Sequence, residues 1–113
     1  MSRGAPQSSL LVLTTLPQRE AAEALARELL AARLAACIQI GTTVHSLYHW
    51  HGEIETADET PVAIKTRAAL YPRLEAAIRA LHPYELPEII AVPISHGLPA
   101  YLEWIAAETV AAG

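Results

Sequence analysis

The sequence predicts an α+β fold in which two strand–helix–strand units follow one another and a further helix ends the chain. Three observations predict it: short runs of branched apolar residues, two segments of helical spacing between such runs, and a central stretch typical of a hairpin. The chain has 113 residues, a length that suggests one domain. We assign residues 9–113 to this domain and residues 1–8, which are polar and show no periodicity, to a flexible tail.

The first unit begins with the run SLLVLTT at residues 9–15, whose successive branched apolar residues predict a strand buried on both faces. Apolar residues then recur at helical spacing from residue 18 to about residue 34, which predicts an amphipathic helix. The run AACIQI at residues 35–40 predicts the second strand.

The middle of the chain predicts a long hairpin. Residues 44–55, VHSLYHWHGEIE, continue as a third extended segment, and residues 52–59 look like the tip of the hairpin. The run TPVAIKT at residues 60–66 then returns as a strand.

The second unit and the last helix complete the order. Apolar residues at helical spacing from residue 70 to residue 81 predict the second helix. Residues 87–95, PEIIAVPIS, predict a strand, and Pro93 within it indicates an edge strand or a bulge. Gly97 and Pro99 precede a last helix.

This order predicts a ferredoxin-like split arrangement, in which right-handed crossovers place both crossover helices on one face of an antiparallel sheet. The predicted strands are apolar on both faces, whereas these two helices cover only one. The other face needs a partner, since apolar surface removed from water contributes about 25 cal/mol per Å². We therefore expect a homo-oligomer.

Composition excludes several classes of function. The formal net charge is −4, with 8 basic and 12 acidic residues, which argues against a nucleic-acid partner. No stretch approaches the roughly 20 apolar residues of a membrane helix, and we see no signal peptide. A single cysteine, Cys37, cannot form an internal disulfide, so we expect a cytoplasmic location.

Three of the five histidines, His45, His49 and His51, stand at alternate positions of the predicted hairpin arm. They share one face if no bulge intervenes, and His49 and His51 form a pair that can bind one zinc or copper ion. His45 lies about 13 Å further back at ~3.3 Å per residue and cannot share that ion. The alternative is an exposed arm with solvated imidazoles. Tyr48 and Trp50 lie on the opposite face, where we expect a subunit contact.

A second candidate is the run LHPYELPEI at residues 81–89. His82 ends the second helix, and Tyr84 and Glu85 follow Pro83 in a rigid, polar connection. Rigid placement of a His, a Tyr and a carboxylate suits a ligand site. A helix end followed by a tight turn has the same sequence, and both interpretations stay open.

Five runs of sequence together resemble one known family: LAACIQI, SLYHWHGEIE, AIKT, LHPYELPEIIAVPISHG and YLEWI. They are similar to the CutA family, the divalent-cation tolerance proteins, from about Leu10 to Ile105. The resemblance implies a ferredoxin-like subunit in a tight homotrimer, with a long second strand that reaches toward a neighbouring subunit. It also implies a role in the response to metal ions, copper binding, and no firmly attached enzyme activity.

The resemblance also implies site residues. His82 matches the family's metal-associated histidine, but the cysteine of the family's copper site corresponds to Thr14, and a second histidine corresponds to Leu81. A hydroxyl is a poor ligand for soft copper(I), so we expect weak binding of copper(II) or another divalent cation and no required cofactor. We predict metal ligands at His82, Glu85, His49 and His51, and a trimer interface or cleft at Tyr48, Trp50 and Tyr84.

Two other functions are weighed. One is a PII-like small-molecule sensor or interaction trimer without a physiological metal, although TTLPQREA lacks the glycines of a phosphate cradle. The other is an acylphosphatase-like hydrolase, for which Arg19 is available but the required asparagine is absent from the chain. We expect no enzyme activity.

Overall fold

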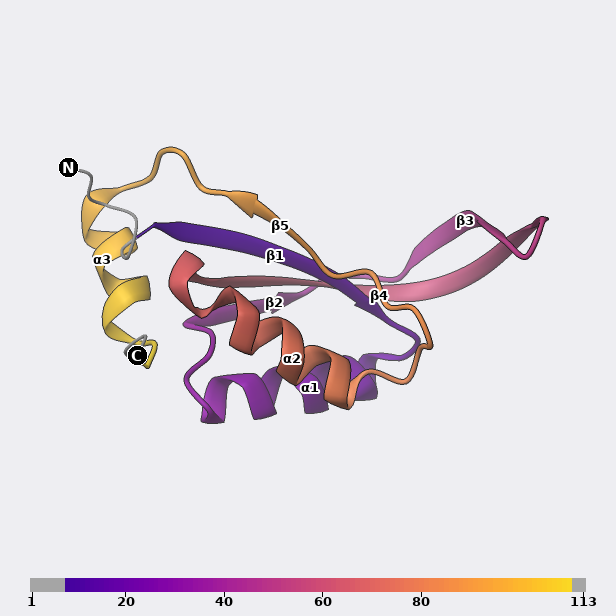
Figure 1. Cartoon of the computed structure of the whole chain (residues 1–113), viewed down its shortest axis with the longest axis horizontal. Coiled ribbons are helices and arrows are strands. Elements are labelled where there is room, and N and C mark those ends of the chain that lie inside the picture. Colours follow the sequence, from indigo (N-terminus) through magenta and orange to yellow (C-terminus); the bar gives the residue numbers. More distant parts are fainter. Residues whose placement is uncertain (1–7, 111–113) are drawn as a thin grey trace.

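The computed structural model describes residues 8–110, which form one sheet with helices packed against it and a hairpin that projects from the body (Figure 1). The projection gives the chain an elongated shape of 47 × 26 × 25 Å. Residues 1–7, most of the predicted tail, lie outside the described part. Ser8 is held against the body, since its carbonyl accepts a hydrogen bond of 2.7 Å from the Ala68 N–H.

The sheet has the strand order β2-β4-β1-β5, and all neighbouring strands in it are antiparallel. A further strand, β3, pairs with the first half of β4 to form the projecting hairpin. The strands are β1 (Ser9–Leu16), β2 (Cys37–Ile40), β3 (Val44–Trp50), β4 (Glu53–Arg67) and β5 (Ile90–Pro93). The predicted α+β fold is confirmed, and Pro93 lies in an edge strand as its position predicts.

The helices are α1 (Arg19–Ala31), α2 (Tyr71–Leu81), which follows a short 3-10 turn η2 (Ala68–Leu70), and α3 (Pro99–Ala107). α1 and α2 lie along one face of the sheet (Figure 1). Alternate residues of β1 and β4 point toward these helices, and their side chains are almost fully buried. The core between sheet and helices includes Val12, Leu16, Leu25, Leu29, Val62, Ile64, Leu74 and Ile78.

α1 ends three residues before the predicted boundary. Arg33 adopts a left-handed conformation with φ 57°, and the Leu34 N–H donates to the Leu29 carbonyl at 3.1 Å. This is the six-to-one hydrogen bond that commonly closes a helix, here with an arginine at the position usually taken by glycine. Leu29 and Leu34 are both in the buried core, so their contact supports this ending.

The hairpin differs most from expectation. Residues 53–59, predicted as its tip, belong to the 15-residue strand β4, and the turn consists of His51 and Gly52 alone. Both turn residues have positive φ, 50° and 80°, which matches the right-handed twist of the flanking strands.

The edge strand β5 is also shorter than predicted. It has four residues, whereas the sequence predicts a strand over residues 87–95.

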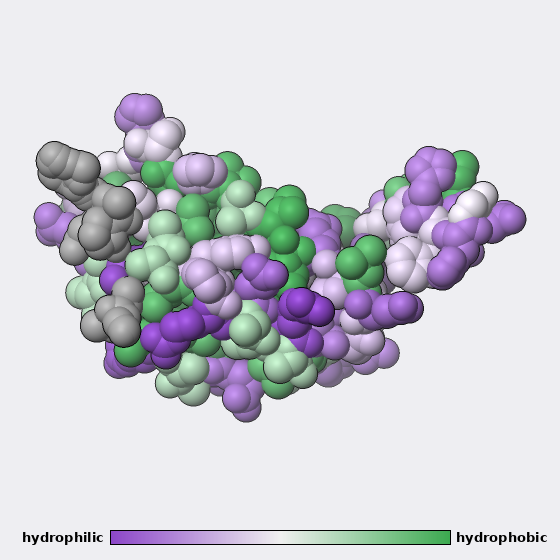
Figure 2. Space-filling view, viewed as in Figure 1, coloured by the Kyte–Doolittle hydropathy of each residue, from purple (hydrophilic) through white to green (hydrophobic). Residues whose placement is uncertain are grey.

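The second face of the sheet, which we call the open face, carries Leu11, Leu13, Ala63, Ile90 and Val92. These side chains are apolar, whereas Lys65 and Arg67 of β4 share the same face, and Ile90 and Val92 are 51% and 46% exposed. Green, hydrophobic residues are visible along the middle of the molecule in Figure 2.

α3 covers one end of the open face, which the sequence did not predict. Its Ile105 is fully buried, and the Arg67 side chain of β4 donates to the Thr109 hydroxyl at 2.8 Å and to the Val110 carbonyl. Within residues 8–110, no helix is long and apolar enough to cross a membrane.

Candidate functional site

A cavity of about 750 Å³ lies between the projecting hairpin and the loop that connects α2 to β5. We call it the hairpin cavity. β3 and β4 contribute one wall, and the loop contributes the other. Its lining residues are Thr15, Ser46, Leu47, Tyr48, His49, Trp50, Glu55, Glu59, Pro83, Tyr84, Glu85, Leu86 and Glu88.

Glu59, which is buried, and Tyr84, which is half-buried, are neighbours in the lining of the cavity. Glu59 is only 9% exposed, and its Oε2 accepts a hydrogen bond of 3.2 Å from the Thr15 hydroxyl. Burial, followed by the hydrogen bond to Glu59 and the negative charge of its carboxylate, raises the pKa of Tyr84 to about 12. The Tyr84 hydroxyl therefore stays protonated to a higher pH than a free tyrosine.

His82 stands behind the cavity and holds the loop to the sheet. Its Nδ1 accepts a hydrogen bond of 3.2 Å from the Tyr84 N–H, so Nε2 carries the proton and donates to the Thr15 carbonyl at 2.7 Å. The ring is 9% exposed and lies 4.9 Å from the ring of Tyr84. In this conformation His82 has no ring nitrogen lone pair free for a metal ion.

The structure brings together five of the predicted site residues. The lining of the hairpin cavity includes Tyr48, His49 and Trp50 from β3, and Tyr84 and Glu85 from the loop. The regular pairing of β3 with β4 keeps His49 on the strand face opposite Tyr48 and Trp50, as predicted. Antiparallel pairing places β3 beside β4, and the turn after α2 returns the loop to the same end of the sheet.

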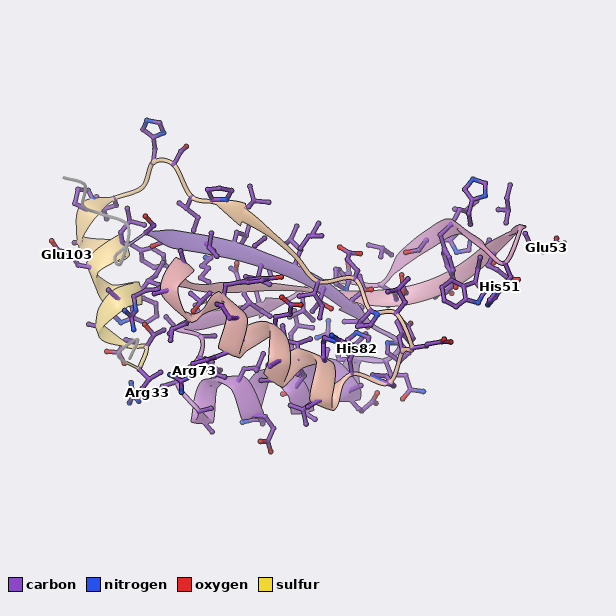
Figure 3. All side chains as sticks on the ribbon, in the orientation of Figure 1. Arg33, His51, Glu53, Arg73, His82 and Glu103 are labelled. Atoms are coloured by element: carbon purple, nitrogen blue, oxygen red, sulfur yellow. The ribbon has the colours of Figure 1, made fainter. Side chains whose placement is uncertain are left out.

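His82 and His51 do not join this group. His82 lies near the end of α2 and His51 at the far tip of the hairpin, well separated in Figure 3. The prediction that His51 shares a strand face with His49 is wrong, because His51 is a left-handed turn residue beyond the end of β3. His45 is paired with Asp58 across the hairpin, with Nδ1 and Oδ1 2.8 Å apart.

Metal-ligating side chains are dispersed rather than clustered. Among residues 8–110, no group of three or more His, Cys, Asp or Glu residues is placed to hold a metal ion. Thr14, at the position of the family's cysteine, is 1% exposed, and its hydroxyl has no hydrogen-bond partner within the described part.

Sequence reasoning missed Glu59 and Thr15. The alternation of Glu53, Glu55 and Glu59 along β4 places these side chains on one face, but nothing in that pattern distinguishes the buried carboxylate from the exposed ones. Burial of Glu59 depends on Thr15 and Tyr84, which come from distant parts of the chain.

The combination of a long hairpin, this strand order and the His-Pro-Tyr-Glu loop also occurs in known proteins. Residues 10–108 match the family model described as "CutA1 divalent ion tolerance protein". The chain belongs to the CutA family. The family match covers every helix and strand except the first residue of β1.

Individual CutA proteins agree with this assignment. The chain is 40% identical over 99 residues to the "Divalent-cation tolerance protein CutA" of Thermus thermophilus, covering 88% of this chain and 96% of that protein. It is 40% identical over 97 residues to "Protein CutA, chloroplastic" of Arabidopsis thaliana, and it spans about half of that relative, 53% of its length. The crystal structure of CutA from Xylella fastidiosa superposes with a TM-score of 0.87 at 43% identity, covering 90% of this chain and 98% of that one.

Proposed function

We propose that this chain acts in the response to divalent metal ions, as a homotrimer that binds copper(II) or another divalent cation weakly. Membership of the CutA family over residues 10–108 is the observation that carries the proposal. The Thermus thermophilus relative is named for divalent-cation tolerance.

The proposed cation ligands are His49, His51, His82 and Glu85, although His51 and His82 do not lie together in this conformation and cannot both contribute to one site. His49 and Glu85 line the hairpin cavity, whereas His82 must first release the Tyr84 N–H from Nδ1 before that nitrogen can bind a metal, while its Nε2–H can keep the Thr15 carbonyl. Breaking this largely buried hydrogen bond costs on the order of 1–3 kcal/mol for the N–H left unpaired. This cost is the physical reason for a low affinity.

Calorimetric titration of copper(II) tests the proposed site. We expect His49→Ala and His82→Ala to bind copper(II) more weakly than the wild type. His45→Ala is the matched control, because His45 lies on the same hairpin but pairs with Asp58 instead of lining the cavity. If His82→Ala and the wild type bind copper(II) with equal affinity, His82 is not a ligand. If the wild type, His49→Ala, His82→Ala and His45→Ala all bind with equal affinity, the proposed site is wrong.

The proposed trimer rests on the open face. The strand order β2-β4-β1-β5, with α1 and α2 on one face, supports a ferredoxin-like subunit whose other face is apolar and partly exposed. We propose that the open faces meet in the trimer and that the hairpin cavity, with Tyr48, Trp50 and Tyr84, lies at a cleft between subunits. Sedimentation should give three times the 12.2 kDa protomer mass, and a stable monomer at micromolar concentration would contradict this assembly.

We further propose a cytoplasmic location and no catalytic role. The single cysteine, Cys37, supports a reducing compartment. The Arabidopsis thaliana relative is named as chloroplastic, so the compartment differs within the family. Cell fractionation with an antibody to this protein tests the location directly, and recovery outside the cytoplasm would contradict it.

A further inference from the structure

The hairpin cavity combines aromatic walls with carboxylates. Its aromatic side chains are Tyr48, Trp50 and Tyr84, and its carboxylates are Glu55, Glu59, Glu85 and Glu88. The lining contains no Lys or Arg. A volume of about 750 Å³ falls within the range of small-molecule sites, roughly 300–1,000 Å³.

No ion pair within the described part of one protomer neutralises the carboxylates of the cavity. Within residues 8–110, the carboxylates that form ion pairs are those of Glu23, Asp58 and Glu108, and none of these lines the cavity. Glu59 is largely buried, and its Oε2 accepts a hydrogen bond from the neutral hydroxyl of Thr15. A cationic ligand would therefore gain an attraction that no side chain of the cavity already satisfies.

The arrangement of the carboxylates favours an extended cation over a metal ion. The four carboxylates share one cavity, yet the described residues offer no cluster in which three of them could hold a single ion. Separated carboxylates match a ligand whose positive charges are separated as well.

The aromatic walls point to an organic cation. Tyr48 is 42% exposed, and Trp50 and Tyr84 are half-buried, so each ring retains accessible surface. Ammonium groups and the methylene groups next to them bind aromatic faces favourably, with Trp the strongest partner. Tyr84 is also held in place by His82, through its N–H and a ring contact at 4.9 Å, which reduces the ordering cost of binding.

We propose that the hairpin cavity is a binding site for a linear aliphatic polyamine. Its ammonium groups would pair with Glu59 and the more exposed carboxylates, while its methylene chain would lie against Trp50 and Tyr48. This site goes beyond the proposed response to metal ions and does not depend on it.

Tryptophan fluorescence offers a local measurement. The chain has two tryptophans, and Trp104 stacks on Tyr101 in α3, at the end of the molecule opposite the hairpin. In a Trp104→Phe background Trp50 is the single reporter. We expect titration with spermidine to give a saturable change in Trp50 emission, and potassium chloride at matched ionic strength to give none.

Two variants test the recognition, with affinity measured by calorimetry in the wild-type background. Trp50→Leu removes the best aromatic face and Glu59→Gln removes the buried charge, and we expect each to weaken spermidine binding roughly tenfold. Glu23→Gln is the matched control, since it removes an exposed carboxylate on α1 and should leave binding unchanged. If Trp50→Leu fails to fold, Tyr48→Leu replaces it with the same expected loss.

Three results would overturn the polyamine site: no saturable binding of spermidine, equal affinity in the aromatic variant and the wild type, or the same emission change with potassium chloride. The copper(II) titration is an independent measurement. Loss of spermidine binding in Trp50→Leu with copper(II) binding retained supports this site separately from the proposed metal response.

Discussion

His82 belongs to the His-Pro-Tyr-Glu motif of the family, and in this structure its role is to hold two parts of the chain together. Both of its ring nitrogens bond to backbone groups, one on β1 and one in the following loop. The ring therefore joins the end of α2 to the sheet and sets the direction of the chain into the hairpin cavity. This role accounts for a rigid His-Pro-Tyr-Glu loop whether or not a metal binds there.

Replacement of His82 by alanine should destabilise the protein. The Thr15 carbonyl and the Tyr84 N–H lose their partner at a site that is only 9% exposed, so we expect the free energy of unfolding to fall by about 2 kcal/mol. Urea denaturation at fixed protein concentration measures the change. His96→Ala is the control, because His96 is exposed and its Nδ1 is hydrogen-bonded to the neighbouring Ser95 hydroxyl. Equal effects of the two variants would show that these hydrogen bonds contribute nothing.

The raised pKa of Tyr84 predicts that the stability of the fold depends on pH. Its pKa is raised to about 12 in the folded protein, against about 10 in the unfolded chain, so folding favours the protonated form. The resulting stabilisation is fully present below pH 10 and is lost as the pH rises toward 12. Between these values the free energy of unfolding should fall more steeply in the wild type than in Tyr84→Phe. Parallel curves would contradict the raised pKa, and absorbance at 295 nm follows the ionisation itself.

At the scale of elements, the tight two-residue turn allows the two strands of the hairpin to pair along their whole length. Two residues with positive φ close it, and every residue from Val44 to Trp50 finds a partner in β4. A looser tip would have left residues 53–59 unpaired and opened one wall of the hairpin cavity.

Substitutions in this turn should act in opposite directions. Gly52→Ala places a side chain at φ 80° with no heavy atom within 4 Å of the new Cβ, so its cost is one of backbone conformation alone, about 1–2 kcal/mol. His51→Asn should raise the melting temperature slightly, because Asn adopts positive φ more readily. Thermal unfolding followed by circular dichroism measures both. A Gly52→Ala protein as stable as the wild type would show that the hairpin tolerates another turn.

At the scale of the whole molecule, the two faces of the sheet differ in their covering. α1 and α2 lie along one face and bury its middle, whereas α3 covers only one end of the other. The part of the open face next to β5 is apolar and exposed. In a free monomer this apolar surface would be in contact with water. The proposed trimer explains this asymmetry.

A charge on the open face should dissociate the proposed trimer. Val92 lies beside Leu11 on this face, so Val92→Glu would place a carboxylate among apolar side chains at the expected contact. We expect light scattering to report a protomer mass for this variant. Ala24→Glu on the exposed side of α1 is the matched control and should keep the mass of the wild type. An unchanged mass for Val92→Glu would move the interface elsewhere.

The order of strands and helices follows from the sequence because each element carries its own periodicity. The branched runs of β1 and β4 and the helical spacing of α1 and α2 reflect contacts with one core, so they are readable without coordinates. Pro93 likewise indicates an edge strand through its missing N–H. The family resemblance, confirmed by the match over residues 10–108, depends on the same local runs.

Other features were decided by tertiary structure alone. The hydrogen bonds of His82, the burial of Glu59 and the hairpin cavity all require residues from β1, β4 and the loop after α2 to come together. No local sequence pattern predicts these long-range contacts. His51 became a turn residue because pairing of β3 with β4 left only two positions for the chain to reverse. Periodicity in the sequence determined which faces are apolar, whereas long-range packing determined which polar groups are enclosed, because burial depends on neighbours that are distant along the chain.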